Sequence, residues 1–376
     1  MNILGSLYFV ASYIVPFVFV LSVVVFFHEM GHFLVGRWCG VKVDAFSLGF
    51  GPEIFAFTDK RGTRWRLAAL PLGGFVKFHG DANAASMSDA EQIAAMPAEE
   101  RAVSFFSQKV WKRAAIVAAG PMANFLLAIV IFTCIFFGYG REVLAPRIES
   151  VRAGEAGEVA GFQAGDLIVS INGEAIGTWN EMQRVVQMSG GVPLSFVVRR
   201  GTQEVTLNAT PRQRDVDTPF GKHRVGLLGV TASSEVTDWR IERYSLVQSA
   251  RIATQETWFI IDRTVSYIGG VFSGRETAEQ ISGPIRIAEI SGEVAKVGIG
   301  ALLNLAAILS VSVGLINLFP VPLLDGGHLL YYLVEALRGR PMSERAQELG
   351  FKVGIALVGA LMIFATFNDV LHLSRG

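Results

Sequence analysis

Residues 1–32 read MNILGSLYFVASYIVPFVFVLSVVVFFHEMGH, and this stretch decides how the chain folds. Its first 27 residues include no charged side chain, and about 20 apolar residues are enough to cross the hydrocarbon core of a bilayer. The stretch therefore predicts a transmembrane helix over residues 1–36 that contains His28, Glu29 and His32. Ionisable groups are costly at membrane depth and generally persist there for function, so three within five residues indicate a functional site.

A cleaved signal peptide is the competing interpretation of the same stretch. Such a peptide begins with a basic segment, which a short apolar core and a cleavage site follow. Here no basic residue precedes the apolar run, and the run continues directly into His28. A retained transmembrane helix accounts for both features.

The composition excludes several classes of protein. The chain has 376 residues, of which 51% are hydrophobic and only 18% charged, and its mean hydropathy is +0.42, so a single soluble globule is not expected. Its 33 basic and 33 acidic residues cancel, which gives no indication of a nucleic-acid surface. Two cysteines are too few for a disulfide framework or a thiolate zinc site, so a metal would need His and carboxylate ligands.

Three further stretches are apolar enough to predict transmembrane helices. Within them, residues 114–140 and 297–324 contain no charged side chain, and residues 353–368 form a shorter apolar run. We place these spans at residues 113–140, 297–330 and 353–372. The sequence therefore predicts an α-helical polytopic membrane protein with four transmembrane helices.

The Lys and Arg residues predict the orientation, because basic residues that flank a span favour the cytoplasm. No basic residue precedes the first span, whereas residues 37–112 and 331–352 are basic next to the spans. We therefore place these two segments in the cytoplasm, and the N-terminus and residues 141–296 outside. The charges of the long external segment do not oppose this, since long domains cross membranes largely regardless of charge.

The external segment begins with short strand patterns that are separated by turns. Asp166-Leu-Ile-Val-Ser-Ile-Asn-Gly173 reads as a strand with an Asn-Gly turn, residues 180–188 have helical spacing, and Leu194-Ser-Phe-Val-Val-Arg-Arg-Gly201 reads as a second strand. This order over residues 141–212 resembles an inserted α+β PDZ domain of the bacterial protease type, with an unrelated β-rich spacer as the alternative. Residues 213–296 form an amphipathic region that predicts helices on the membrane surface.

His28-Glu-Met-Gly-His32 is an HExxH motif within the first predicted helix. A spacing of four residues places both imidazoles on one helical face, one turn apart, so both can bind one metal ion. Glu29 then flanks the metal without binding it and can take a proton from metal-bound water.

A third ligand is expected, because catalytic zinc sites usually have three protein ligands and one open position. The third span ends in Asn317-Leu-Phe-Pro-Val-Pro-Leu-Leu-Asp325, and the predicted orientation places this end on the same side as His28. Pro320 and Pro322 should break the helix there, which is tolerated at membrane depth where the backbone lines a polar cavity. The alternative role of Asp325 is an interfacial helix cap.

The two motifs together resemble those of the site-2 protease family of intramembrane zinc metalloproteases. The likeness extends over essentially the whole chain in the bacterial branch typified by the regulator-of-sigma-E protease. The segments that resemble motifs of this branch are Phe46-Ser-Leu-Gly-Phe-Gly-Pro52, Leu70-Pro-Leu-Gly-Gly-Phe-Val-Lys77, Gly120-Pro-Met-Ala-Asn124 and Ser282-Gly-Pro-Ile-Arg-Ile-Ala288. By this resemblance residues 70–77 form a membrane re-entrant β-loop. Some relatives carry two PDZ domains, and we find one here.

The resemblance also implies roles for individual residues. It makes His28, His32 and Asp325 the ligands of a Zn²⁺ ion, Glu29 the general base and Asn317 a residue that engages the substrate. It further places the protein in the bacterial inner membrane, with its N-terminus and PDZ domain in the periplasm.

The expected reaction is hydrolysis of peptide bonds inside the membrane. The expected substrates are single-span proteins that an upstream site-1 protease has already shortened, such as anti-sigma factors, or remnant signal peptides. A helical substrate has to unwind, and we expect a strand edge at Gly73 and Gly74 to hold it, because glycine allows close backbone approach. The lipid bilayer is the other expected partner.

Two other classes of protein stay open at this point. A membrane scaffold that captures peptides through its PDZ domain would need no zinc, so a metal analysis separates it from a protease. A zinc transporter would need ionisable ligands along several spans, whereas the second and fourth spans contain few or none.

The remaining histidines have less specific interpretations. His79 and His223 lie in polar stretches, and His372 lies near the end of the chain, so we expect all three at a surface or membrane interface. His328 follows Asp325 by three residues, but two glycines loosen the geometry between them, and we expect a structural role.

Overall fold

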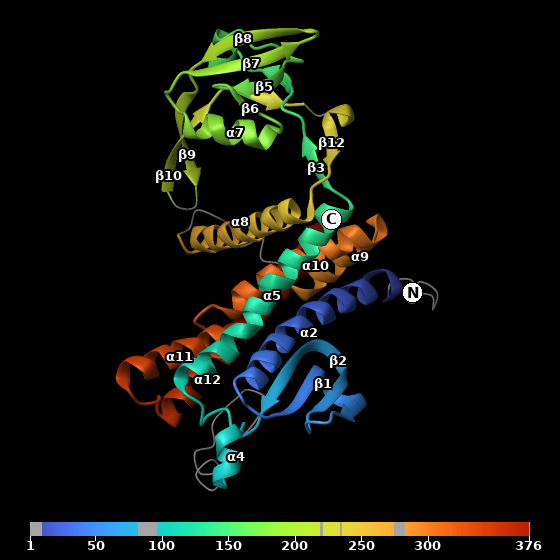
Figure 1. Ribbon diagram of the computed structural model, residues 1–376, viewed down its shortest axis with the longest axis vertical. Coiled ribbons are helices and arrows are strands. Elements are labelled where there is room, and N and C mark those ends of the chain that lie inside the picture. Colours follow the sequence, from blue (N-terminus) through green and yellow to red (C-terminus); the bar gives the residue numbers. More distant parts are fainter. Residues whose placement is uncertain (1–9, 82–95, 219–220, 234, 274–282, 376) are drawn as a thin grey trace. The chain divides into compact units, whose positions relative to one another are not determined.

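The computed structural model describes residues 10–81, 96–218, 221–233, 235–273 and 283–375 (Figure 1). The chain forms two compact units, each with its own internal contacts. Unit 1 consists of Met1–Thr133, Ala250–Thr264 and Ala278–Gly376, and unit 2 of Cys134–Ser249 and Val265–Thr277.

Four helices among the described residues are long and apolar enough to cross a membrane, which matches the four spans expected. The first is the π-helical turn η1 (Val10–Ile14) with α2 (Val15–Trp38), and the second is α5 (Val110–Gly138). The others are α10 (Ile299–Asn317) and the part of α12 (Glu344–Arg375) from Arg345 to Leu371. The chain is a multi-pass membrane protein.

The helix ends around the third and fourth spans differ from the expected boundaries. We expected a span over residues 297–330, but α10 ends at Asn317 and a separate helix α11 runs over Asp325–Arg338. The break contains Pro320 and Pro322, whose rings remove backbone donors and clash with a preceding turn. Residues 331–352, which we expected as a loop, are largely helical, because α11 continues to Arg338 and α12 already begins at Glu344.

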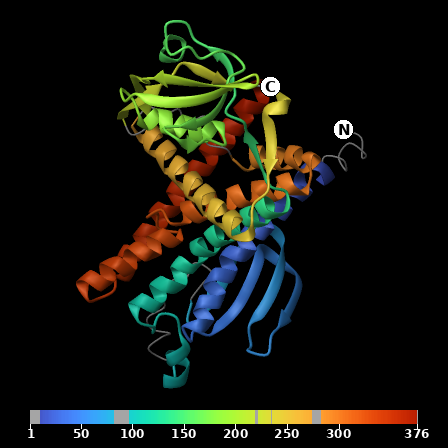
Figure 2. The ribbon, with the colours of Figure 1, turned by 45° about the horizontal axis from the view of Figure 1, so that its top comes forward.

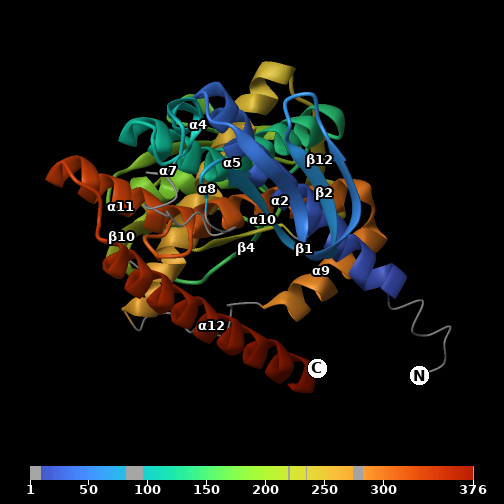
Figure 3. The ribbon, with the colours of Figure 1, turned by 90° about the horizontal axis from the view of Figure 1, so that it is seen from below.

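Strands β1 (Val43–Thr58) and β2 (Arg64–Phe78) form a long hairpin beside α2 (Figure 3). The register is irregular: residues 43–48 pair with residues 74–78 and also with residues 64–67. Residues 70–77, which we expected as a re-entrant β-loop with a strand edge, lie within strand β2. Aromatic rings fix the hairpin on α2, since Phe33, Phe46 and Trp65 have ring centroids 4.6 to 5.6 Å apart. The short helix α4 (Ala98–Val103) precedes α5.

Helix α9 (Pro284–Val297) completes unit 1. It contacts η1, α2 and α10, and more sparsely α12. The same unit thus contains all the residues of the predicted site.

Unit 2 contains a four-stranded sheet of order β6-β5-β7-β8. Its strands are β5 (Leu167–Ile171), β6 (Glu174–Ala175), β7 (Leu194–Arg200) and β8 (Gln203–Ala209). Helix α7 (Trp179–Met188) covers one face of this sheet (Figure 2), and the short helix α6 (Ala156–Val159) contacts β8. The core between them includes Met182, Val186, Phe196 and Val198.

Unit 2 extends beyond residue 212, where we expected its folded domain to end. Strand β4 (Ile148–Val151) pairs with β11 (Val230–Ala232), and β3 (Arg141–Leu144) pairs with β12 (Trp239–Glu242). Leu228 is buried in the same core as the sheet. The expected boundary was wrong because the closing strands pair with the first ones, a long-range contact that no local pattern reveals.

The remaining elements of unit 2 follow the sheet. A hairpin of β9 (Arg212–Thr218) and β10 (Gly221–Leu227) comes first, and the 3-10 turn η2 (Val236–Asp238) precedes β12. Helix α8 (Leu246–Phe272), whose residues Ala250–Thr264 belong to unit 1, then begins with a capping box of Ser245 and Gln248.

Candidate metal centre

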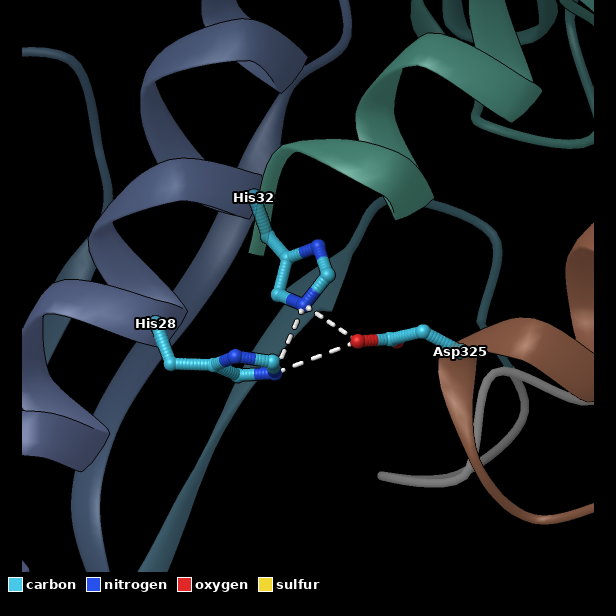
Figure 4. Close-up of side chains that lie close together, drawn as sticks. All are labelled: His28, His32 and Asp325. Atoms are coloured by element: carbon cyan, nitrogen blue, oxygen red, sulfur yellow. Dashed lines mark hydrogen bonds and ion pairs between the residues drawn. The ribbon is translucent and has the colours of Figure 1, made fainter. Parts of the chain in front are cut away.

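Three side chains from two separate elements meet in unit 1 (Figure 4). His28 and His32 extend from one face of α2, and Asp325 is the first residue of α11. Nε2 of His28 lies 3.3 Å from Nε2 of His32 and 3.2 Å from Oδ2 of Asp325, and Nε2 of His32 lies 3.5 Å from the same oxygen. Within the described residues this is the one group of three or more His, Cys, Asp or Glu side chains that could hold a metal ion.

These distances fit a tetrahedral zinc site. Zinc–ligand bonds of about 2.0–2.1 Å place two ligand atoms of a tetrahedron about 3.3–3.4 Å apart. Oδ2 of Asp325 is buried and has no hydrogen-bond partner among the described residues. A buried carboxylate oxygen without a partner is expected where that oxygen binds a cation.

Helix α5 orients both imidazoles. Nδ1 of His32 lies 2.9 Å from the backbone oxygen of Ile116 and donates to it, which leaves Nε2 free to bind a metal. Nδ1 of His28 lies 3.2 Å from the side-chain amide of Asn124, whose Oδ1 is buried without a partner in the described structure. Turning this amide by half a rotation lets Oδ1 accept from Nδ1 of His28, and both groups are then satisfied.

Two glycines let α2 and α5 approach closely enough for these contacts. A Cβ at Gly120 would lie 2.2 Å from Nε2 of His32, and a Cβ at Gly31 would lie 2.2 Å from the backbone oxygen of Ala119. Neither position has room for a side chain. The segment from Gly120 to Asn124 resembles a family motif, but the sequence alone predicts no role for either residue.

Glu29 lies beside the three side chains, in a cavity of about 320 Å³. The backbone of Val76 in β2 hydrogen-bonds its carboxylate. A Cβ at Gly74 would lie 3.0 Å from Cγ of Glu29, and Gly73 has a φ of 115°, which favours glycine. Strand β2 therefore passes directly beside Glu29 because Gly74 lacks a side chain, whereas a Cβ at Gly73 would meet the ring of Phe50.

A tight turn positions Asp325. Leu323 has a φ of 110°, which is strained for a residue with a side chain. A Cβ at Gly326 would lie 2.3 Å from the backbone oxygens of Leu318 and Phe319, so the turn folds back onto the end of α10. Asn317, the last residue of α10, lines the same cavity as Glu29.

The other histidines lie outside the three-residue group. His328 lines the cavity without joining the group, and His79 contacts Asp44, with Nδ1 3.1 Å from the carboxylate. His223 lies in β10. His372 lies in α12, and its side chain is outside the described residues.

The sequence matches the model of peptidase family M50 over residues 16–361. The chain belongs to peptidase family M50. An Agrobacterium fabrum protein with the provisional name zinc metalloprotease is 47% identical over 370 residues, which cover 98% of each chain. Metalloprotease MmpA of Caulobacter vibrioides is 39% identical over 95% of each chain. Among solved structures, the PDZ domain of an SdrC-like protein from Listeria monocytogenes matches 23% of this M50 chain and 84% of its own length, at 18% identity and a TM-score of 0.19.

Proposed function

We propose that this M50 peptidase is an intramembrane zinc metalloprotease that cleaves transmembrane segments of single-span proteins already shortened outside the membrane. The observation that carries the proposal is the group of His28, His32 and Asp325, with Glu29 lining the same cavity. The group is assembled from helices of a multi-pass membrane protein. The relative from Agrobacterium fabrum is named a zinc metalloprotease and the one from Caulobacter vibrioides a metalloprotease, and both names agree with this donor set.

In this proposal His28, His32 and Asp325 hold the zinc ion. Bound zinc polarises the scissile carbonyl and lowers the pKa of a water molecule. Glu29 accepts the proton of the attacking water and passes it to the leaving amine, a role that suits a carboxylate beside the ligand group. Asn124 and the backbone of Ile116 keep the two imidazoles in the orientation that zinc needs.

Strand β2 is the proposed support for the substrate. A helical substrate hydrogen-bonds its own carbonyls, so it has to unwind before cleavage, and an extended segment can add to a strand edge. The part of β2 at Gly73 and Gly74 lies beside Glu29, which supports binding there, and Asn317 offers an amide in the same cavity.

The hairpin also supports a re-entrant placement in the membrane. Six of its exposed side chains are large and apolar, and such a patch is expected to meet lipid or a partner. They are Phe50, Ile54, Phe55, Phe57, Leu67 and Leu70.

The proposed location is the bacterial inner membrane, with the N-terminus and unit 2 in the periplasm. The basic residues around residues 37–112 and 331–352 support this orientation. Unit 2 would then act as a PDZ domain that excludes substrates with bulky external domains, and an upstream site-1 protease would remove those domains.

The test compares membrane proteomes of cells that carry the wild-type chain or Glu29→Gln. We expect truncated single-span proteins to accumulate with Glu29→Gln, because the metal stays bound but proton transfer is lost. Glu99→Gln on the exposed helix α4 is the matched control and should behave like wild type. Identical proteomes for Glu29→Gln and wild type would contradict the proposal.

A further inference from the structure

A second cavity of about 170 Å³ lies between α2, α9 and α10. All its lining residues are apolar, so a polar group that enters would lose its hydrogen bonds. They are Phe17, Val20, Leu21, Val24, Pro284, Ile287, Leu309 and Val313. Val313 also lines the cavity that contains Glu29, so the two cavities adjoin.

Hydrogen bonds at both ends of α9 hold one wall of this apolar cavity. At the N-terminus of α9, the buried carboxylate of Asp369 in α12 accepts from the backbone amides of Gly283, Ile285 and Arg286 at 2.8 to 3.1 Å. Near the other end, the hydroxyl of Tyr13 donates to Glu293 at 2.8 Å. These hydrogen bonds therefore fix the position of α9, and neither Asp369 nor Tyr13 lines the cavity.

The cavity lies toward the N-terminal end of α2 from His28. Leu21 and Phe17 precede His28 by seven and eleven residues, which corresponds to about 10 and 16 Å along the helix axis. An extended peptide covers this distance in about three to five residues. A peptide that stayed helical would need about seven to eleven.

We infer that the apolar cavity is a substrate subsite for one large apolar side chain of the transmembrane segment being cleaved. This inference rests on the proposed function, because it concerns the same substrate. Its position next to the Glu29 cavity, with Val313 in the lining of both, favours a peptide that occupies both, and its uniformly apolar lining selects residues such as Leu or Phe. The side chain belongs to a residue three to five positions from the scissile bond, since the substrate is extended there.

The experiment uses the purified full-length chain in detergent or vesicles and a single-span model substrate. In a set of substrates, one position at a time, up to eleven residues from the cut, carries either Leu or Ala. Wild type should cleave the Leu substrate about tenfold faster at one position, three to five residues from the bond. Leu309→Phe narrows the cavity and should abolish this preference, while an Ala substrate is still cleaved.

Ile308→Phe is the matched control, because Ile308 is the adjacent residue of α10 and is 37% exposed, outside the cavity lining. It should keep the preference. If Leu309→Phe does not fold, Ile287→Phe narrows the same cavity from α9 and should give the same result.

Three outcomes would overturn the inference. The first is equal cleavage of Leu and Ala substrates at every position by an active wild-type enzyme. The second is a preference that Leu309→Phe and Ile287→Phe leave intact. The third is equal slowing of all substrates by Leu309→Phe with zinc content unchanged, which would indicate a lipid acyl chain in the cavity. Absence of any cleavage by zinc-loaded wild type is a different result, because it refutes the proposed function itself.

Discussion

Asn124 controls which nitrogen of His28 faces the metal centre. A histidine that binds zinc through Nε2 carries its proton on Nδ1, and this proton needs an acceptor. The side chain of Asn124 lies 3.2 Å from Nδ1, and its backbone oxygen accepts from Ser310 at 2.9 Å. Asn124 is thereby fixed to α10 while it orients a side chain of α2.

We predict that Asn124→Ala weakens zinc binding about 10- to 100-fold, the usual effect of removing such a partner of a histidine ligand. Asn124→Asp restores an acceptor for Nδ1 of His28 and should recover much of the affinity. Competition with a chromogenic chelator measures both variants. An Asn124→Ala protein with wild-type affinity would show that the imidazole needs no support from this residue.

At the scale of single residues, the sequence predicts some parts of the site and not others. His28, Glu29 and His32 were predictable because four residues make one helical turn, and Asp325 was predictable because it ends a proline-broken apolar run. Gly120 and Asn124 were not, since their importance depends on how α5 faces α2. One signal was available, because an Asn within an uncharged span needs a partner for its amide.

Arg113 and Glu335 join α5, which contacts both imidazoles, to α11, which carries Asp325. The guanidinium Nη2 of Arg113 in α5 lies 2.6 Å from Glu335 in α11, and both side chains are largely buried. Arg113 also lies over the ring of Tyr332, 4.9 Å from its centroid. Because α11 begins with Asp325, this ion pair fixes the helix that carries the proposed third ligand.

We predict that Glu335→Gln destabilises unit 1 by about 3–5 kcal/mol, because it leaves a buried Arg113 without its counter-charge, and that it lowers zinc affinity. The charge-reversed pair Arg113→Glu with Glu335→Arg should recover part of both. Thermal unfolding and chelator competition are the measurements. Glu348→Gln, which breaks an exposed pair with Lys352, is the control and should change neither. If Glu335→Gln lowers stability but leaves zinc affinity unchanged, the ion pair does not support the metal centre.

At the scale of elements, long uncharged runs predict helices because each one satisfies its own backbone hydrogen bonds in lipid. The four helices were therefore predictable. The irregular pairing of β1 and β2 was not, because residues 43–48 pair with two different segments of β2, and no local pattern shows such double pairing. Residues 331–352 were expected to form a loop because they contain no long apolar run, but most of them belong to α11 and α12.

Unit 2 can be removed at a position that its own pairing defines. Arg141 and Glu242 are partners in the β3–β12 pair, so a short linker can join the two positions. We predict that replacing residues 141–242 by a short Gly-Ser linker preserves zinc and cleavage of a pre-shortened substrate, and permits some cleavage of the full-length one. Deletion of residues 145–212 alone leaves β11 and β12 in the chain but removes β4 and the sheet, so it should lower protein levels. A stable, zinc-loaded 141–242 deletion that cleaves neither substrate would show that unit 2 helps to build the active conformation.

The central claim is that His28, His32 and Asp325 bind one zinc ion while Glu29 does not. The most direct test is the zinc content per chain of purified wild type, Glu29→Gln and Asp325→Asn, measured by inductively coupled plasma mass spectrometry. We predict about one zinc per chain in wild type and Glu29→Gln and markedly less in Asp325→Asn, because only the last variant weakens one of three ligands. Wild-type zinc content in Asp325→Asn, or loss of zinc in Glu29→Gln, would contradict the assignment.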